Sequence, residues 1–89
     1  MDEYIAVVKN FAINYEPVNW MKCDGRHLDI RQYTPLYSLI GTKYGGDGST
    51  YFCLPDFRPD NASKTEKRDW LPTELVPMIC VYGLYPTHQ

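Results

Sequence analysis

The sequence predicts an α+β fold: a small single domain in which short, mostly antiparallel strands surround one short helix, with long ordered loops between them. Runs of β-branched and aromatic residues are short, and each is bounded by proline, glycine or aspartate, which is typical of small sheets. One segment instead has the i, i+3, i+4 spacing of an amphipathic helix. With 89 residues the chain has the length of one domain, so we expect a single domain over 1–89.

The N-terminal part is expected to begin with a strand over residues 4–12, YIAVVKNFA, before Glu16 and Pro17 interrupt the pattern. Asp24 and Gly25 then separate two short runs in which apolar and polar residues alternate. An Asp-Gly pair in such a place is a strong signal for a β-hairpin. We therefore expect the two flanking runs to pair with each other and to turn at Asp24 and Gly25.

A short helix is expected to end at Gly41. Its apolar stripe consists of Leu36, Tyr37, Leu39 and Ile40. Thr34 is a residue type that caps helices, and Pro35 is tolerated in a first helical turn. Gly41 can adopt the left-handed conformation that ends a helix, so we expect about two to three turns.

A glycine-rich loop is expected to return the chain from the helix to the next strand. The turn residues of this loop are Gly45, Gly46, Asp47 and Gly48. Regular structure tolerates so many glycines poorly, whereas tight turns require them. The following strand is expected over residues 51–54.

Pro55 is expected to end that strand, and Asp56 and Arg58 to begin a polar loop that extends to residue 67. Arg58 is expected to hold Asp56, and with it the loop, by a charge-assisted hydrogen bond. The apolar run MICVYGLY then predicts a closing strand at about residues 76–86.

Composition and charge argue against several function classes. The net charge is −2, and the nine Lys and Arg residues are spread along the chain without a basic stripe, which argues against nucleic-acid binding. No run approaches the roughly 18 apolar residues of a membrane-spanning helix, and the N-terminus lacks the pattern of a signal peptide. We therefore expect no nucleic acid, no membrane insertion and no secretion by a signal peptide.

The cysteines, Cys23, Cys53 and Cys80, are interpreted as reduced and buried, because their number is odd and they lie far apart in the sequence. A zinc site completed by His27 or His88 is the alternative interpretation. No two of these candidate ligands have the short spacing that forms half of a zinc site, so we expect no metal.

The loop YGGDG could form an anion-binding nest, but no lysine and hydroxyl residue follow it at the spacing of a phosphate-binding loop. Four aspartates could be combined as calcium ligands or as an acid and base pair: Asp24, Asp29, Asp47 and Asp56. They lie in separate turns, so local hydrogen bonds to backbone N–H groups are the favoured interpretation. With no relay around either histidine, we expect no catalytic residue, no cofactor and no enzyme activity.

The order of these motifs resembles the phage tail collar family. The matching residues are Phe11-Ala12, Pro17 with Trp20, Cys23-Asp24-Gly25, Leu28 with Ile30, Leu36 with Leu39, Gly41-Thr42, Tyr44 to Gly48, and Phe52 to Arg58. This motif core covers about residues 4–58, and the residues GLYP at 83–86 occupy the place of the closing G-I-F-P of the family. The chain departs from longer members at Pro59, because the glycine-rich continuation that they carry is replaced by about twenty residues.

The resemblance implies a non-enzymatic structural or recognition role in a phage tail, as part of a tail fibre, a collar, a baseplate or a tail tip. It implies a virion protein, made in the host cytoplasm, whose partners are other phage tail proteins and further copies of itself, with a homotrimer as the first expectation. A host surface receptor is a further candidate partner. The alternative is a free phage-encoded or bacterial intracellular protein that reuses the fold to bind a small ligand or a host protein.

Aromatic residues make up 15% of the chain, more than one small core encloses, so several are expected in an interface. The candidates are Trp70, Tyr82 and Tyr85. Two alternatives remain open from the sequence: Trp70 could cover the core of its own domain, and Tyr82 could be the outward residue of the last strand.

Overall fold

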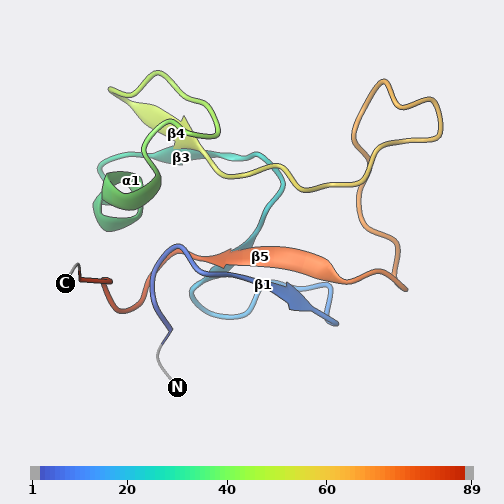
Figure 1. The fold of residues 1–89 in the computed structure, drawn as a ribbon, viewed down its shortest axis with the longest axis horizontal. Helices are drawn as coiled ribbons and strands as arrows, with labels where there is room; N and C mark the ends of the chain where they lie inside the picture. Colours follow the sequence, from blue (N-terminus) through green and yellow to red (C-terminus); the bar gives the residue numbers. More distant parts are fainter. Residues whose placement is uncertain (1–2, 88–89) are drawn as a thin grey trace.

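The computed structural model describes residues 3–87, and its elements confirm the α+β fold (Figure 1). In chain order the elements are β1 (Val8–Phe11), β2 (Trp20–Lys22), β3 (His27–Asp29), α1 (Thr34–Ile40), β4 (Tyr51–Cys53) and β5 (Val76–Cys80). Every strand pair within the two sheets is antiparallel. Among the described residues no helix is long and apolar enough to cross a membrane.

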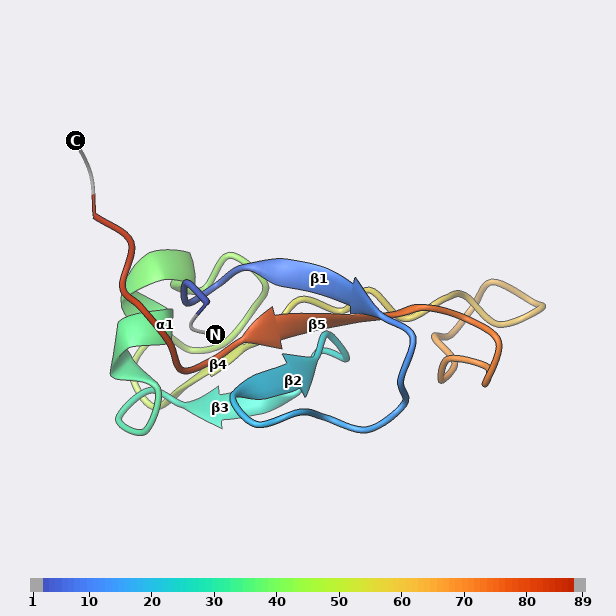
Figure 2. The ribbon, with the colours of Figure 1, turned by 90° about the horizontal axis from the view of Figure 1, so that it is seen from below.

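The larger sheet has three strands in the order β1-β5-β2, so the closing strand lies at its centre (Figure 2). Val8 is the partner of Ile79 on one side of β5, and Met21 is the partner of the same residue on the other. β5 occupies only the first part of the 76–86 segment expected from the sequence. Beyond it, the chain bends at Gly83, and Leu84 forms an isolated parallel bridge with Tyr4.

The expected hairpin at Asp24 and Gly25 is wrong. β2 pairs with β5, whereas β3 pairs with β4 in a separate two-stranded sheet, so the residues between β2 and β3 cross from one sheet to the other. The Gly25 N–H donates to the Pro55 carbonyl at 3.0 Å, and Asp24 forms an isolated bridge with Asp56. The turn therefore pairs with the chain that follows β4, because this distant partner satisfies the backbone groups that a hairpin would have used.

The N-terminal strand is shorter than the expected 4–12, because Ala6 has a φ of 76°, outside the extended region. The helix is confirmed, and it ends where expected: the N–H of Gly41 donates to the Tyr37 carbonyl at 2.7 Å. Thr34 is not the cap of this helix. Its Oγ1 instead donates to the Ile30 carbonyl at 2.9 Å, inside the preceding turn.

One hydrophobic core joins α1 to both sheets. Its buried members are Ile5, Cys23, Leu28, Leu36, Phe52, Leu54, Ile79 and Val81. Leu36, Phe52 and Leu54 have no exposed surface, and full burial of such a side chain contributes about 1.5–3 kcal/mol. The core therefore fixes β3, β4 and α1 relative to β5, although these elements are only three to seven residues long.

Between β4 and β5 the chain projects away from this core, as Figure 1 shows for the yellow to orange segment. We call residues 59–75 the arm. Its shape is held by its own contacts: the Asn61 N–H donates to the Glu66 carbonyl at 2.8 Å, and Lys67 pairs with Asp60 at 3.1 Å. Nearer the body, Arg68 forms two hydrogen bonds with Glu74, at 2.8 and 3.0 Å. The arm is thus an ordered projection, although it has no strand of its own.

Candidate functional site

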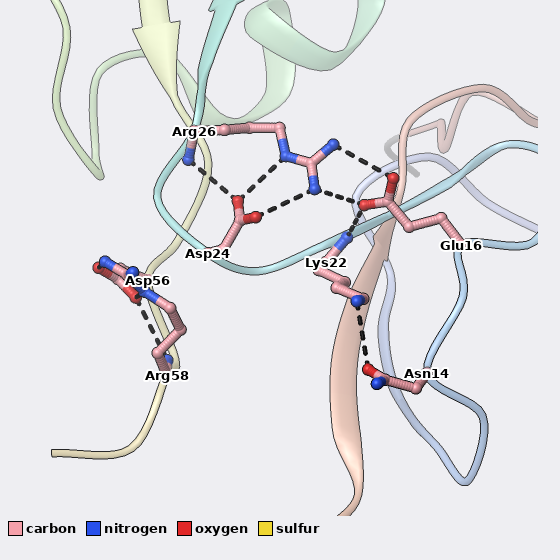
Figure 3. Close-up of polar contacts among 7 residues, drawn as sticks. All are labelled: Asn14, Glu16, Lys22, Asp24, Arg26, Asp56 and Arg58. Atoms are coloured by element: carbon pink, nitrogen blue, oxygen red, sulfur yellow. Dashed lines mark hydrogen bonds and ion pairs between the residues drawn. The ribbon is translucent and has the colours of Figure 1, made fainter. Parts of the chain in front are cut away.

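A network of charged and polar side chains lies where the chain crosses between the two sheets (Figure 3). We call it the Arg26 network; its members are Asn14, Glu16, Lys22, Asp24 and Arg26. The Arg26 guanidinium lies between two carboxylates. Its Nε and Nη2 donate to Asp24 at 3.0 Å each, and its Nη1 and Nη2 donate to Glu16 at 3.3 and 2.5 Å.

Glu16 and Lys22 connect this network to the larger sheet. Glu16 Oε2 also accepts the backbone N–H of Lys22 at 2.7 Å, and Lys22 Nζ donates to Asn14 Oδ1 at 3.2 Å. Two segments, the loop 12–19 and the crossing 22–26, are therefore held together by side-chain hydrogen bonds. Charge-assisted bonds of this kind are stronger than bonds between neutral groups, and the bidentate Arg fork fixes their direction.

The charged forms of Asp24 and Arg26, at the centre of the network, are favoured. For the pKa of Asp24, burial is the largest single influence and acts to raise it, but the hydrogen bonds and the charge of Arg26 together lower it below its usual value. The hydrogen bond to Asp24 raises the pKa of Arg26, with a smaller contribution from Glu16, although burial acts against both. Both groups consequently remain charged at neutral pH.

The network forms one wall of a groove of about 350 Å³, the Arg26 groove. Its lining residues are Asn14, Glu16, Lys22, Asp24, Arg26, Asp69 and Trp70. Five of them come from the two segments that the network joins, and Asp69 and Trp70 come from the arm. The groove therefore lies between the body and the arm.

A second Arg–Asp pair lies close to this network in Figure 3 but serves the next turn. Arg58 Nε and Nη2 donate to Asp56 at 2.9 Å each, and Asp56 also accepts the backbone N–H of Arg58. The pairing holds the chain at the point where it leaves Pro55, which is fully buried, and begins the arm.

The glycine-rich loop is organised by Asp47. Its Oδ1 accepts the backbone N–H groups of Ser49, Thr50 and Tyr51 at 2.9, 2.8 and 3.1 Å, and its Oδ2 accepts the Thr50 hydroxyl at 2.5 Å. These hydrogen bonds, that of the Thr50 side chain first, lower the pKa of Asp47 below its usual value. Of the N–H groups in the candidate anion nest, those of Gly45 and Gly48 instead donate to the Thr42 and Tyr51 carbonyls, at 3.0 and 3.3 Å.

The three expected interface residues do not form one surface. Trp70 precedes β5 and lines the Arg26 groove, whereas Tyr82 and Tyr85 follow β5 and lie beside α1. Tyr82 stacks on Tyr33 with a 5.2 Å separation of ring centroids, and the Tyr85 hydroxyl bonds to Ser38 at 2.7 Å. Both tyrosines nevertheless remain about half exposed.

The thiols of Cys23 and Cys80 are buried, and Cys53 is half-buried; all three are free. Burial raises the pKa of Cys23 to about 12, so its thiol stays protonated. His27 stacks on Tyr51 at 4.5 Å, while His88 lies outside the described residues. Within residues 3–87 no group of three or more His, Cys, Asp or Glu side chains could hold a metal ion.

Comparison with known families decides the identity. The family model described as Phage Tail Collar Domain matches residues 6–60, which is more than half of the chain. The chain belongs to the phage tail collar domain family. The match includes β1 to β4, the Arg26 network and the Asp47 loop, and it ends where the arm begins.

Protein RhiB from Rhizobium leguminosarum bv. viciae is a relative of this collar domain, with 44% identity over 46 residues. The match covers 48% of the chain and 21% of RhiB, so the chain corresponds to about a fifth of that relative. No solved structure matches.

Sequence reasoning missed Glu16 and Arg26, which form the centre of the network in this collar domain. One signal could have identified Arg26: the pattern Asp-x-Arg occurs at 24–26, 29–31 and 56–58. In all three copies the Asp Oδ1 atom accepts the backbone N–H of the Arg two residues later, at 3.2, 2.7 and 3.2 Å. Glu16 joins through tertiary contact ten residues away, and no local pattern marks that contact.

Proposed function

We propose that this collar domain is a non-enzymatic structural or recognition component of a phage tail, in a tail fibre, a collar, a baseplate or a tail tip. The observation that carries the proposal is the family match over residues 6–60. It is supported by the construction of the domain, in which loops and an arm ordered largely by their own hydrogen bonds extend from a small core. Loops positioned by a rigid core commonly carry the residues that bind partners.

In this proposal the chain associates with further copies of itself, most simply as a homotrimer, and with other tail proteins. Recognition of a host surface receptor is a further proposed role. The surface beside α1 is the place where association would occur. Its half-exposed apolar residues are Tyr4, Tyr82, Leu84 and Tyr85. They are neighbours because Leu84 bridges to Tyr4, which brings the two ends of the described chain together.

The apolar area of the surface beside α1 is smaller than that of a complete protein interface. An aromatic residue buries about 150–250 Å², so the exposed halves of three tyrosines and one leucine amount to on the order of 300–450 Å². A standard interface buries about 800 Å² per partner. The surface therefore supplies the apolar centre of an interface, and polar residues around it must supply the rest. A contact through Trp70 would be a separate one, since Trp70 lies at the opposite end of β5.

The test of a tail role is mass spectrometry of purified phage particles from the organism that carries the gene. Recovery of the chain in the particles in a fixed ratio to the tail proteins is the expected result. Its presence in the cell extract and absence from particles would instead support the free intracellular binder. The match to RhiB, a protein of a bacterium, is the observation that favours that second candidate.

The interface is tested separately by Tyr82→Ala with Tyr85→Ala. The expected result is a lower mass by light scattering with an unchanged circular dichroism spectrum. Tyr15→Ala is the matched control, because Tyr15 is a more exposed tyrosine outside this surface. Trp70→Ala measures the separate contact. A wild-type protein that stays monomeric and binds no tail protein would contradict the proposed interface.

A further inference from the structure

The Arg26 groove is lined by groups that remain available to a ligand, although the network at its centre is internally paired. Lys22 uses one of its three N–H donors for Asn14, and Glu16 Oε1 accepts a single bond, from Arg26. The Asn14 amide nitrogen and the Asp69 carboxylate have no partner among the described residues. The groove thus offers donors and an acceptor on the body side and a second acceptor on the arm side.

The charges of the groove disfavour an anionic ligand, and its mixed donors and acceptors suit a ligand with hydroxyl groups. Glu16, Asp24 and Asp69 are negative and Lys22 and Arg26 are positive, and Arg26 is already matched by two carboxylates at hydrogen-bonding distance. An anionic ligand would meet the three carboxylates, and a cationic ligand would meet Lys22. Groups that both donate and accept, such as hydroxyls, can use the available positions on both sides without placing like charges together.

Trp70 also lines this groove. The ring is half-buried and belongs to the arm, outside the segment that matches the family model. An indole presents a flat apolar face against which an apolar ligand face packs, while its N–H can donate to a polar edge. A volume of about 350 Å³ lies at the lower end of the usual range for small-molecule pockets, about 300–1,000 Å³.

We propose that the Arg26 groove binds a neutral saccharide, with the apolar face of one sugar ring on Trp70 and its hydroxyls on Asn14, Lys22 and Asp69. Among small ligands a cyclic sugar combines an apolar ring face with an edge of hydroxyl groups, which is the combination that this groove requires. The Arg26 network positions the polar wall, because it holds loop 12–19 against residues 22–26 before any ligand enters (Figure 3).

The test begins with an array of neutral and charged glycans probed with the wild-type protein, Trp70→Ala and Tyr44→Ala. Tyr44→Ala is the matched control, because Tyr44 is an exposed aromatic residue that packs on Phe57, outside the groove. A retained neutral glycan is then titrated against a Trp20→Phe variant, in which Trp70 is the remaining tryptophan, and its fluorescence reports binding.

We expect a dissociation constant on the order of 1 mM for a mono- or disaccharide. Trp70→Ala should weaken binding about tenfold or more, Asn14→Ala about three- to tenfold, and Tyr44→Ala not at all. Raising NaCl from about 50 to about 500 mM should leave the affinity unchanged, because screening acts on charged partners.

Three results would overturn the proposal. The first is an array on which the wild-type protein retains no neutral glycan above the level of Trp70→Ala. The second is binding that salt abolishes, which would indicate an ionic ligand. The third is a Trp70→Ala protein that is folded and has a lower mass than the wild type, which would assign Trp70 to a subunit contact. Asn14→Ala keeps the test decisive if Trp70→Ala does not fold, since Asn14 is an exposed loop residue.

Discussion

Gly46→Ala should destabilise the collar domain more than any other single added methyl group in the glycine-rich loop. Gly46 has a φ of 116°, and a Cβ atom there would lie 2.5 Å from the Phe52 Cα atom and 2.7 Å from the Tyr51 carbonyl oxygen. Both contacts are with backbone that belongs to β4, and Gly46 forms an isolated bridge with Phe52. The loop and the strand must therefore separate to admit the methyl group.

The loss of folding stability in Gly46→Ala is the sum of two contributions, one from backbone conformation and one from steric overlap. A non-glycine residue in a sparsely populated φ/ψ region costs about 1–3 kcal/mol, and forced overpacking of this kind costs about 1–3 kcal/mol more. The expected loss is about 2–6 kcal/mol. A domain of this length has a total stability of roughly 4–13 kcal/mol, and each kcal/mol lowers Tm by about 4–8 °C. The variant should consequently melt at least about 10 °C below the wild type or be unfolded.

Two other glycines separate the contributions. A Cβ at Gly41, with a φ of 53° and a ψ of −138°, has no heavy atom within 4 Å, so Gly41→Ala should show the backbone cost alone, about 1–3 kcal/mol. A Cβ at Gly83, whose φ is ordinary, would lie 2.1 Å from the Glu3 carbonyl oxygen, so Gly83→Ala should show the steric cost alone. Thermal and urea unfolding followed by circular dichroism measure all three. If Gly46→Ala and Gly41→Ala melt within a few degrees of each other, the loop does not pack on β4 as described.

Three further outcomes are expected. Arg26→Ala should lower the free energy of unfolding, measured in urea, by about 1–2 kcal/mol, because Arg26 joins two segments of the chain. Arg58→Ala should lower it by less than about 1 kcal/mol, because Arg58 hydrogen-bonds to Asp56, only two residues away. Equal losses in the two variants would contradict the joining role of Arg26. The pKa of Asp47 is depressed in the folded state, so the ionised carboxylate stabilises the fold fully above the ordinary pKa of 3.8, and this stabilisation declines as the pH falls below that value. Asp47→Asn should therefore flatten the slope of folding stability against pH below about 4. An unchanged slope would contradict this role of Asp47. Cys23 should react with a thiol reagent at pH 8 only after unfolding, since it is buried and its pKa is raised to about 12; rapid modification of the folded protein at Cys23 in a peptide map would refute this.

Local patterns were sufficient where the chain forms its structure locally. The helix over Thr34–Ile40 needed only an apolar stripe and a glycine after it, and the Asp47 loop needed only an aspartate beside glycines, because each closes its hydrogen bonds within a few residues. The same holds for the local contact between Asp56 and Arg58, which lie two residues apart.

Local patterns failed where a distant partner decides the pairing. Asp24 and Gly25 have the residue types of a hairpin turn, but β2 is only three residues long and pairs with β5, more than fifty residues later in the sequence. Sequence alternation shows that a run can be a strand and does not say which strand it joins. The same limit hid Glu16, whose contact with Arg26 depends on where loop 12–19 returns to the sheet.

In this domain the core orders the strands and the helix, whereas short-range hydrogen bonds of aspartates order the connections. The described strands are three to five residues long, so regular backbone pairing alone holds little of the chain. Aspartates at 24, 29, 47 and 56 each accept a backbone N–H two residues further on, which orders the connections with short-range bonds. A loop ordered in this way does not draw its shape from the core, so its exposed side chains can change without loss of packing. The arm follows the last of these turns and carries Trp70 at its base, so changes along the arm can alter what the groove binds while the core built around Leu36, Phe52 and Leu54 stays the same.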